Sequence, residues 1–264
     1  MYDFQYHRPA SVDDAIKTLN GTSDGKILSG GMTLLPTMKQ RLASPSDLID
    51  LAAIAALKGI KADAKTVRIG AMTVHYDVHA SADVKKAIPA LSVLAGGIGD
   101  PMVRHRGTIG GSIANSDPSA DYPAAVIGLG ATITTNKRDI AADSFFKGLF
   151  ETALEPGEVI TAVTFPIPKR AGYAKFRQPA SRYAMVGVFV AETASGIRVG
   201  VTGAGACAYR VKAMEDALAK NFSADAIKDI KVPSDGLNAD IHGSAEYRAH
   251  LVGIMAQRAV AAAK

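Results

Sequence analysis

Two glycine-rich turns decide the fold of this chain: residues 29–33, Ser-Gly-Gly-Met-Thr, and residues 108–112, Thr-Ile-Gly-Gly-Ser. Paired glycines let backbone N–H groups approach a phosphate closely, because no Cβ stands in the way. Two such turns could hold the two halves of one pyrophosphate, which favours a dinucleotide over a mononucleotide. Neither turn fits the Rossmann or the P-loop glycine pattern, so neither of those nucleotide-binding folds is predicted.

The first turn belongs to a small βαβ-like unit. Residues 26–28 form a short strand that runs into the turn, and residues 48–51 form a second strand. A helix is expected over residues 34–42, with Thr33 available to cap it. The second turn belongs to a longer α+β unit, which ends with the alternating strand at residues 159–165.

The best linker candidate is the Pro- and Gly-containing stretch 166–172, which divides the chain into two domains. Residues 1–168 form the first domain, with subdomains at about 1–56 and 57–168. Residues 173–264 form the second, in which strands are followed by helices, as is typical of a compact α+β domain. Three antiparallel strands are expected over 173–176, 184–192 and 197–202, and helices over 211–220, 224–230 and 244–263.

Composition excludes several classes of function. The net charge is +5, but Lys and Arg are scattered, only 6% of residues are aromatic and Trp is absent, so no nucleic-acid partner is expected. The single cysteine, Cys207, can neither hold an iron–sulfur cluster nor form an internal disulfide. The N-terminus lacks a signal-peptide pattern, and no stretch approaches the ~20 apolar residues of a membrane span. A cytoplasmic location is therefore expected.

The second turn and its flank, residues 104–123, closely resemble the signature of the FAD-binding medium subunits of molybdenum hydroxylases. That family includes aerobic carbon monoxide dehydrogenase and the flavin portion of xanthine dehydrogenase. The first turn and residues 34–42 resemble the family's first flavin loop, and residues 242–248 are similar to the start of its C-terminal helix. The order and size of the domains match over essentially the whole chain.

The resemblance implies an α+β fold of the PCMH or vanillyl-alcohol-oxidase type. Two subdomains hold FAD between them, and a C-terminal domain of a three-stranded sheet plus helices covers the flavin. It also implies partners: a large molybdopterin subunit and a small subunit with two [2Fe–2S] clusters, assembled as an (αβγ)2 heterohexamer. Electrons would pass from the clusters through FAD to an undetermined acceptor, which is a quinone, NAD or oxygen. The complex would lie in the cytoplasm or at the cytoplasmic face of the inner membrane.

The cofactor-binding candidates come from both turns and from the second domain. By resemblance, Tyr183 shields the isoalloxazine ring, although a half-buried tyrosine at a strand edge is the plain alternative. Arg198 is preferred to Lys175 and Arg177 as a cation near the flavin. Met32 stands where many relatives have His or Gln, so the flavin should be non-covalent. The full set is Leu28, Ser29, Gly30, Gly31, Met32, Thr33, Thr108, Ile109, Gly110, Gly111, Ser112, Asn115, Asp117, Asp121, Tyr183 and Arg198.

Several of these residues have a second interpretation as local structure. Thr33 and Ser112 could cap helices, face a phosphate or do both. Asp121 could cap the helix that follows it, or it could bond a polar group of the flavin nucleotide, as the resemblance implies. Asn115 could be a turn residue or a ligand contact, and Asp117 is expected to shape a turn. No catalytic residue and no metal site is predicted in this chain.

Two other functions stay open at this point. A free-standing FAD oxidase or reductase of the same fold would need an acid or base beside the flavin, and none is evident. A non-catalytic scaffold that has lost the cofactor is disfavoured by the intact glycine turns. The visible spectrum of the chain, alone and with its partners, would separate the three. The oxidised substrate is expected to be carbon monoxide, an aldehyde or an N-heterocycle, and this chain does not touch it.

Overall fold

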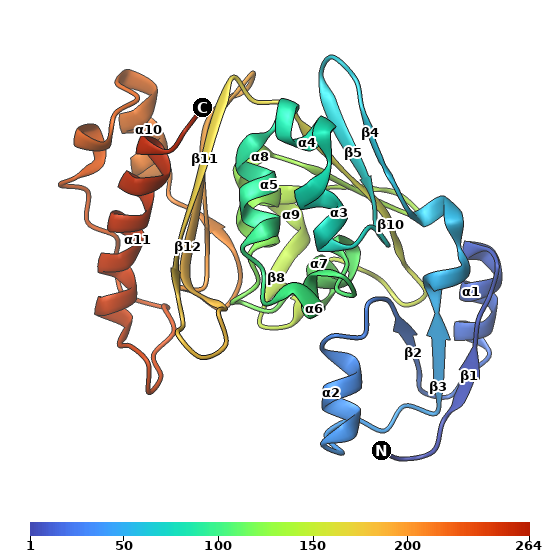
Figure 1. Cartoon of the computed structure of the whole chain (residues 1–264). Coiled ribbons are helices and arrows are strands. Elements are labelled where there is room, and N and C mark those ends of the chain that lie inside the picture. The colour runs from blue at the N-terminus through green and yellow to red at the C-terminus, as the bar shows by residue number, and fades with distance from the viewer.

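The computed structural model describes all 264 residues and arranges them in alternating layers of helix and sheet (Figure 1). Sheets of three, five and four strands, with one two-stranded hairpin, give the mixed α+β fold that the sequence predicts. The N-terminal sheet lies at one end of the molecule and the helices α10 and α11 at the other (Figure 1). None of the helices combines the length and the apolarity that crossing a bilayer would require.

The N-terminal sheet is parallel, with the order β1-β3-β2. Strands that follow one another in the chain and run parallel need a crossover connection, which a helix provides from β1 to β2 and again from β2 to β3. Its elements are β1 (Gln5–His7), α1 (Val12–Asn20), β2 (Gly25–Leu28), α2 (Leu34–Lys39) and β3 (Asp47–Asp50), followed by the 3-10 turns η1 (Leu51–Ala53) and η2 (Ala55–Leu57).

The middle sheet is antiparallel, with the order β4-β5-β10-β6-β7. Its central strand is β10, in which Val163 lies opposite Ile69 of β5 and Ile133 of β6, and all three are fully buried. Its strands are β4 (Ile60–Ala62), β5 (Thr66–Gly70), β6 (Thr132–Thr135), β7 (Asp139–Ala141) and β10 (Ile160–Pro166), and the hairpin β8 (Phe146–Gly148) and β9 (Glu151–Thr152) lies between β7 and β10 in the chain. Its helices are α3 (His75–Ala80), α4 (Ala82–Ala87), α5 (Pro89–Gly96), α6 (Pro101–Arg104), α7 (Ile109–Asn115), α8 (Tyr122–Leu129) and α9 (Ala142–Phe145).

The C-terminal sheet is covered on both faces, by α8 on one side and by α11 on the other (Figure 1). Successive residues of a strand point to opposite faces. In β12, accordingly, Phe189 and Ala191 join the core around α8, whereas Val188 and Val190 join the core around α11. The elements are β11 (Arg170–Arg177), β12 (Ala184–Thr193), β13 (Gly196–Thr202), β14 (Tyr209–Arg210), α10 (Lys212–Lys220), η3 (Ala224–Ile227) and α11 (Ala245–Ala261).

The three strands expected in the C-terminal part are confirmed, and the short β14 extends their sheet. The linker is shorter than expected, because β10 continues to Pro166 and β11 already begins at Arg170. The helix expected at residues 34–42 ends at Lys39, and Arg41 takes a left-handed φ of 61°. The helix expected at residues 224–230 is only a 3-10 turn.

Candidate functional site

A cavity of about 710 Å³ lies where the N-terminal part meets the middle of the molecule. Most of its walls come from residues within the segments 26–34, 98–103, 107–121, 154–160 and 180–183, and Leu51, Ala71, Met72 and His75 complete them. This volume is in the range of small-molecule and cofactor sites. The cavity brings together most of the predicted contacts: Leu28, Ser29, Gly30, Gly31, Met32, Thr33, Thr108, Gly110, Gly111, Ser112, Asn115, Asp117, Asp121 and Tyr183.

The first turn leaves its backbone donors free. Gly31 has a φ of 75°, a left-handed conformation that glycine adopts without strain. The N–H groups of residues 30–33 line the cavity wall and reach no acceptor in the chain. Successive unpaired N–H groups form a concavity that binds anions. The first turn therefore has the donors that a phosphate needs.

The second turn uses its donors within the protein. The N–H groups of Ile109 and Gly110 donate to the carbonyls of Thr73 and Ala71, at 3.1 and 2.8 Å. Thr108 caps α7, because its Oγ1 accepts the N–H of Gly111 at 3.1 Å. The expectation of two equivalent backbone cradles is therefore wrong for this turn, whose amides hold α7 onto the end of β5.

The glycines of both turns allow close contact between protein segments. A Cβ on Gly30 would lie 2.2 Å from the carbonyl oxygen of Arg106, and a Cβ on Gly110 would lie 2.5 Å from the Cβ of Ala71. The hydroxyl oxygens of Ser29 and Thr108 lie 2.6 Å apart, so a hydrogen bond joins the two turns directly. The two turns form one continuous wall of the cavity.

Three polar side chains of this wall have no partner within the chain: Thr33, Ser112 and Asn115. Thr33 occupies the N-cap position of α2 but its side chain makes no capping bond, and Ser112 lies inside α7 rather than before it, so neither hydroxyl caps a helix. Asp117 accepts the N–H of Ser119 at 2.8 Å, as expected of a turn residue. The three unpaired side chains leave donors and acceptors available to a ligand.

Asp121 contributes a buried ion pair to another part of the wall. It adopts helical backbone angles and makes no capping bond, so its predicted role as a cap is wrong. Its carboxylate accepts hydrogen bonds from the Tyr173 hydroxyl and the Lys175 ammonium, and the Lys175 Nζ lies 2.8 Å from Oδ1. Burial raises the pKa of Asp121, and the contacts with Lys175 and Tyr173 oppose that rise. Lys175 also donates to the carbonyl of Gly97 at 3.0 Å.

Tyr183 lies at the edge of the cavity on a strained loop. Its side chain is 46% exposed, and the preceding Arg182 has a left-handed φ of 63°. Two backbone hydrogen bonds close the loop, from Gln178 to the carbonyl of Tyr183 and from Arg182 to the carbonyl of Gln178. A partly exposed aromatic ring is thus held beside the opening of the cavity.

Two predicted contacts lie elsewhere. Arg198 donates from Nε to the carbonyl of Ile127 at 2.7 Å and pairs with Asp143, so it closes the end of α8 and does not line the cavity. Ile109 is fully buried in the core, and its N–H is already bonded. Both placements correct the sequence-based prediction.

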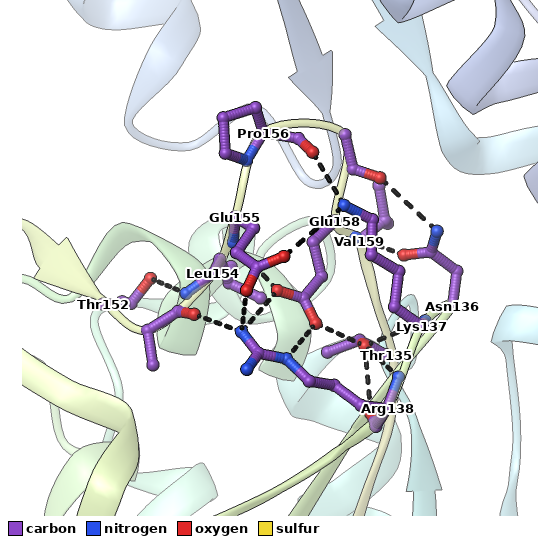
Figure 2. A network of polar contacts seen from close by, with 12 residues as sticks. Thr135, Asn136, Lys137, Arg138, Thr152, Leu154, Glu155, Pro156, Glu158 and Val159 are labelled. Atoms are coloured by element: carbon purple, nitrogen blue, oxygen red, sulfur yellow. Dashed lines mark hydrogen bonds and ion pairs between the residues drawn. The ribbon is translucent and has the colours of Figure 1, made fainter.

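The structure adds residues that the sequence did not single out for this site. Lys175 does not line the cavity itself, but it pairs with Asp121, which does, and its position two residues after Tyr173 puts both side chains on one face of β11. His75 lines the cavity with an unpartnered Nδ1, and burial lowers its pKa to about 4, with a further contribution from Arg104. Glu158 also lines the cavity and is held by the network in Figure 2. No three His, Cys, Asp or Glu side chains lie close enough to share a metal ion.

Comparisons with known proteins identify the family. Residues 2–168 match the FAD binding domain in molybdopterin dehydrogenase. The carbon monoxide dehydrogenase medium chain of Hydrogenophaga pseudoflava is 36% identical over 98% of this chain and 96% of its own length. This chain belongs to the FAD-binding medium subunits of molybdenum hydroxylases.

Other members of this family have different substrates. The nicotine 6-hydroxylase medium subunit of Paenarthrobacter nicotinovorans is 35% identical over 97% of this chain and 95% of its own length. A crystal structure of Cu,Mo-CO dehydrogenase matches with a TM-score of 0.89 and 33% identity, over 99% of this chain and 98% of the matched chain. This medium subunit is thus a flavoprotein component of a molybdenum-containing dehydrogenase, which transfers electrons through FAD.

Proposed function

We propose that the cavity holds one FAD, bound without a covalent link, with its pyrophosphate against the first glycine turn. The observation that carries this proposal is the row of free N–H groups at residues 30–33 inside a cavity of cofactor size. Ser112 and Asn115 stand in the same wall and add uncharged polar groups for the phosphates and the ribityl chain. Met32 offers no nucleophile for attachment.

We place the isoalloxazine ring at the Asp121 end of the cavity. There the Lys175 ammonium, 4% exposed, forms an ion pair with Asp121, which lines the cavity, so the pair presents a polar but nearly neutral group to the ring. The bound FAD supplies the redox chemistry. Tyr183 covers one side of this end. The residues of this chain hold, orient and tune the cofactor, and none acts as an acid or base.

We further propose that this chain works in an (αβγ)2 heterohexamer. A large partner carries the molybdopterin cofactor, and a small partner carries two [2Fe–2S] clusters, since Cys207 alone cannot hold a cluster. Electrons reach FAD from the clusters and leave to a quinone, NAD or oxygen. Residues 1–168 act as the FAD domain and residues 173–264 as the flavoprotein domain that covers it. The substrate, which is carbon monoxide, an aldehyde or an N-heterocycle, is oxidised by the large partner in the cytoplasm or at the inner membrane's cytoplasmic face.

Acid precipitation of the purified chain tests the cofactor. We expect FAD in the supernatant, identified by chromatography. Flavin that stays in the pellet contradicts the non-covalent site, FMN in the supernatant contradicts the dinucleotide, and a colourless protein supports the scaffold alternative.

Native mass spectrometry of the complex from its source tests the assembly. We expect three different chains, two copies of each, with iron and molybdenum in the same particle. A monomeric yellow enzyme that oxidises substrate without either metal contradicts the subunit role and supports a free-standing oxidoreductase.

A further inference from the structure

The segment 153–159, between β9 and β10, forms an apolar wall of the cavity. Leu154 and Val159 line it from this segment, and Leu51 and Met72 line it from the N-terminal part. Val159, Leu51 and Met72 also belong to one buried cluster. The wall therefore depends on the position of this segment, which contains little regular structure of its own.

One arginine outside the cavity holds the segment in place (Figure 2). Arg138 donates from Nε to Glu158 Oε1 at 3.0 Å and from Nη2 to Glu158 Oε2 at 3.1 Å. Its Nη2 also donates to the carbonyl of Ala153 at 2.9 Å, so one guanidinium reaches both ends of the segment. Such forked, charge-assisted bonds fix geometry as well as adding stability.

The Glu158 carboxylate is the anchor on the segment. Its side chain is fully buried, and it accepts the N–H of Glu155 at 2.8 Å in addition to the Arg138 bonds. The bonds from Arg138 lower its pKa to about 2 against the effect of burial, so Glu158 is ionised at neutral pH. A buried ionised carboxylate that lost its arginine would have to move or take up a proton.

The turn between β6 and β7 completes the support. Asn136 accepts the N–H of Val159 on its Oδ1 at 2.7 Å and donates its own N–H to the carbonyl of Val159 at 3.1 Å. Lys137 donates to the carbonyl of Pro156 at 3.0 Å (Figure 2). The segment is thus bonded at Ala153, Pro156, Glu158 and Val159 to the turn of a single hairpin.

We propose that Arg138 is a positioning residue for the adenine half of the cofactor. By holding the segment 153–159, it keeps Leu154 and Val159 in the cavity wall together with Leu51 and Met72, and these four side chains form an apolar slot for a flat aromatic ring. The slot lies on the side of the cavity that contacts the N-terminal core, whereas Asp121 and Lys175 belong to the side next to the C-terminal sheet. This inference rests on the proposed FAD site, and it makes Arg138 a determinant of selectivity for FAD over FMN.

Titration calorimetry of the full-length, flavin-free chain with FAD, ADP and FMN tests the inference. ADP carries the adenine half of the ligand, and FMN carries the flavin half. In Arg138→Gln we expect the Kd to rise about tenfold for FAD and for ADP, and to change by less than about twofold for FMN. If Arg138 only stabilised the fold, its substitution would weaken the binding of all three ligands together.

The chain offers a matched control and a second variant. Arg170→Gln also removes an arginine from a glutamate, Glu192 at 2.7 Å, but neither residue lines the cavity, so all three Kd values should stay at their wild-type levels. If Arg138→Gln does not fold, Leu154→Ser tests the slot directly. This variant should raise the Kd for FAD and for ADP but not for FMN.

The outcomes separate this inference from the proposed function. Unchanged FAD binding in both variants, or equal losses for FAD and FMN, overturns the role of Arg138 while leaving an FAD site in place. Failure of the wild-type chain to bind FAD overturns the proposed function itself.

Discussion

The two glycine turns look alike in the sequence and do different work in the fold. At residues 30–33 the backbone N–H groups have no partner, whereas at residues 109–112 each N–H donates to an oxygen of the chain. Gly31 is required for its left-handed φ, and Gly110 is required because its neighbour stands too close for a side chain. Both turns make close packing contacts through a glycine, but only the first leaves its N–H groups without a partner in the chain.

The largest change in the free energy of unfolding should come from adding one methyl group at Gly110. In Gly110→Ala the new Cβ would lie 2.5 Å from the Cβ of Ala71 and 2.7 Å from its carbonyl oxygen. Because backbone atoms cannot yield easily, we expect a loss of about 3 kcal/mol in the free energy of unfolding. Gly253→Ala, in α11 with nothing within 4 Å of the new Cβ, is the matched control and should stabilise by up to about 1 kcal/mol. Urea denaturation measures both, and equal effects at the two positions would contradict the packing role.

Acid should lower the stability of the fold through His75, whose backbone is bonded to the second turn. Its N–H donates to the carbonyl of Gly107, next to Thr108, and the pKa of its ring is lowered to about 4 in the fold, from 6.5. The unfolded chain therefore binds the proton first, so stability that is complete above pH 6.5 falls as the pH drops from 6.5 towards 4.

We expect this one ring to account for about 3 kcal/mol of the loss between those limits. Urea denaturation at several pH values measures it as the difference between wild type and His75→Phe, which has no proton to gain. Parallel pH curves for the two proteins would show that the ring does not titrate with unfolding.

Gly31→Ala should separate ligand binding from stability. Gly31 and Gly59 both have a left-handed φ, 75° and 102°, so backbone strain from an alanine costs roughly 1 kcal/mol of stability at either position. At Gly31 the new Cβ would also lie 2.8 Å from Cδ1 of Leu35, which must shift, whereas at Gly59 it would meet nothing within 4 Å. Only Gly31 lies in the cavity wall. We expect the Kd for FAD to rise about tenfold in Gly31→Ala and to stay at the wild-type value in Gly59→Ala. A wild-type Kd in both variants would mean that the first turn does not bind the phosphates.

The smallest expected difference in stability is between substitutions of the two threonines that precede α2 and α7. Thr108→Val removes the cap of α7 and the bond to Ser29, and should cost about 1 kcal/mol in thermal or urea unfolding. Thr33→Val removes no bond to the chain and should leave stability within about 0.5 kcal/mol of wild type. A larger stability loss at Thr33 than at Thr108 would reverse the assignment of the two turns.

Much of the local structure followed from the sequence because its causes are local. Alternating apolar residues predicted β10, the three main strands of the C-terminal sheet were also expected, and the first glycine pair predicted where β2 gives way to α2. Most of the predicted contacts also line one cavity. The strands and the first turn depend on residues that are close in the chain, so a single sequence contains their signal. The convergence of residues 28–33, 108–121 and 183 on one cavity is not local and was expected from the family resemblance.

The errors concern interactions across the fold. Arg198 was expected at the flavin, but the carbonyl of Ile127 and the carboxylate of Asp143 hold it elsewhere. Lys175 was set aside, yet it forms the buried pair with Asp121. No residue near Arg138 in the chain indicates that Glu158 will pair with it. Arg138 lies in the turn between β6 and β7, Glu158 lies just before β10, and only the pairing of these strands in the sheet brings the two side chains together.

The sequence by itself determined the class of the fold, the family and the two turns at which a nucleotide could be held, because glycine pairs, apolar alternation and a lone cysteine act through the backbone and through composition. Only the tertiary structure decided which turn keeps its N–H groups free. Whether an amide is available depends on the carbonyls that packing brings to it, and the carbonyls of Ala71 and Thr73 reach the second turn because β5 ends there.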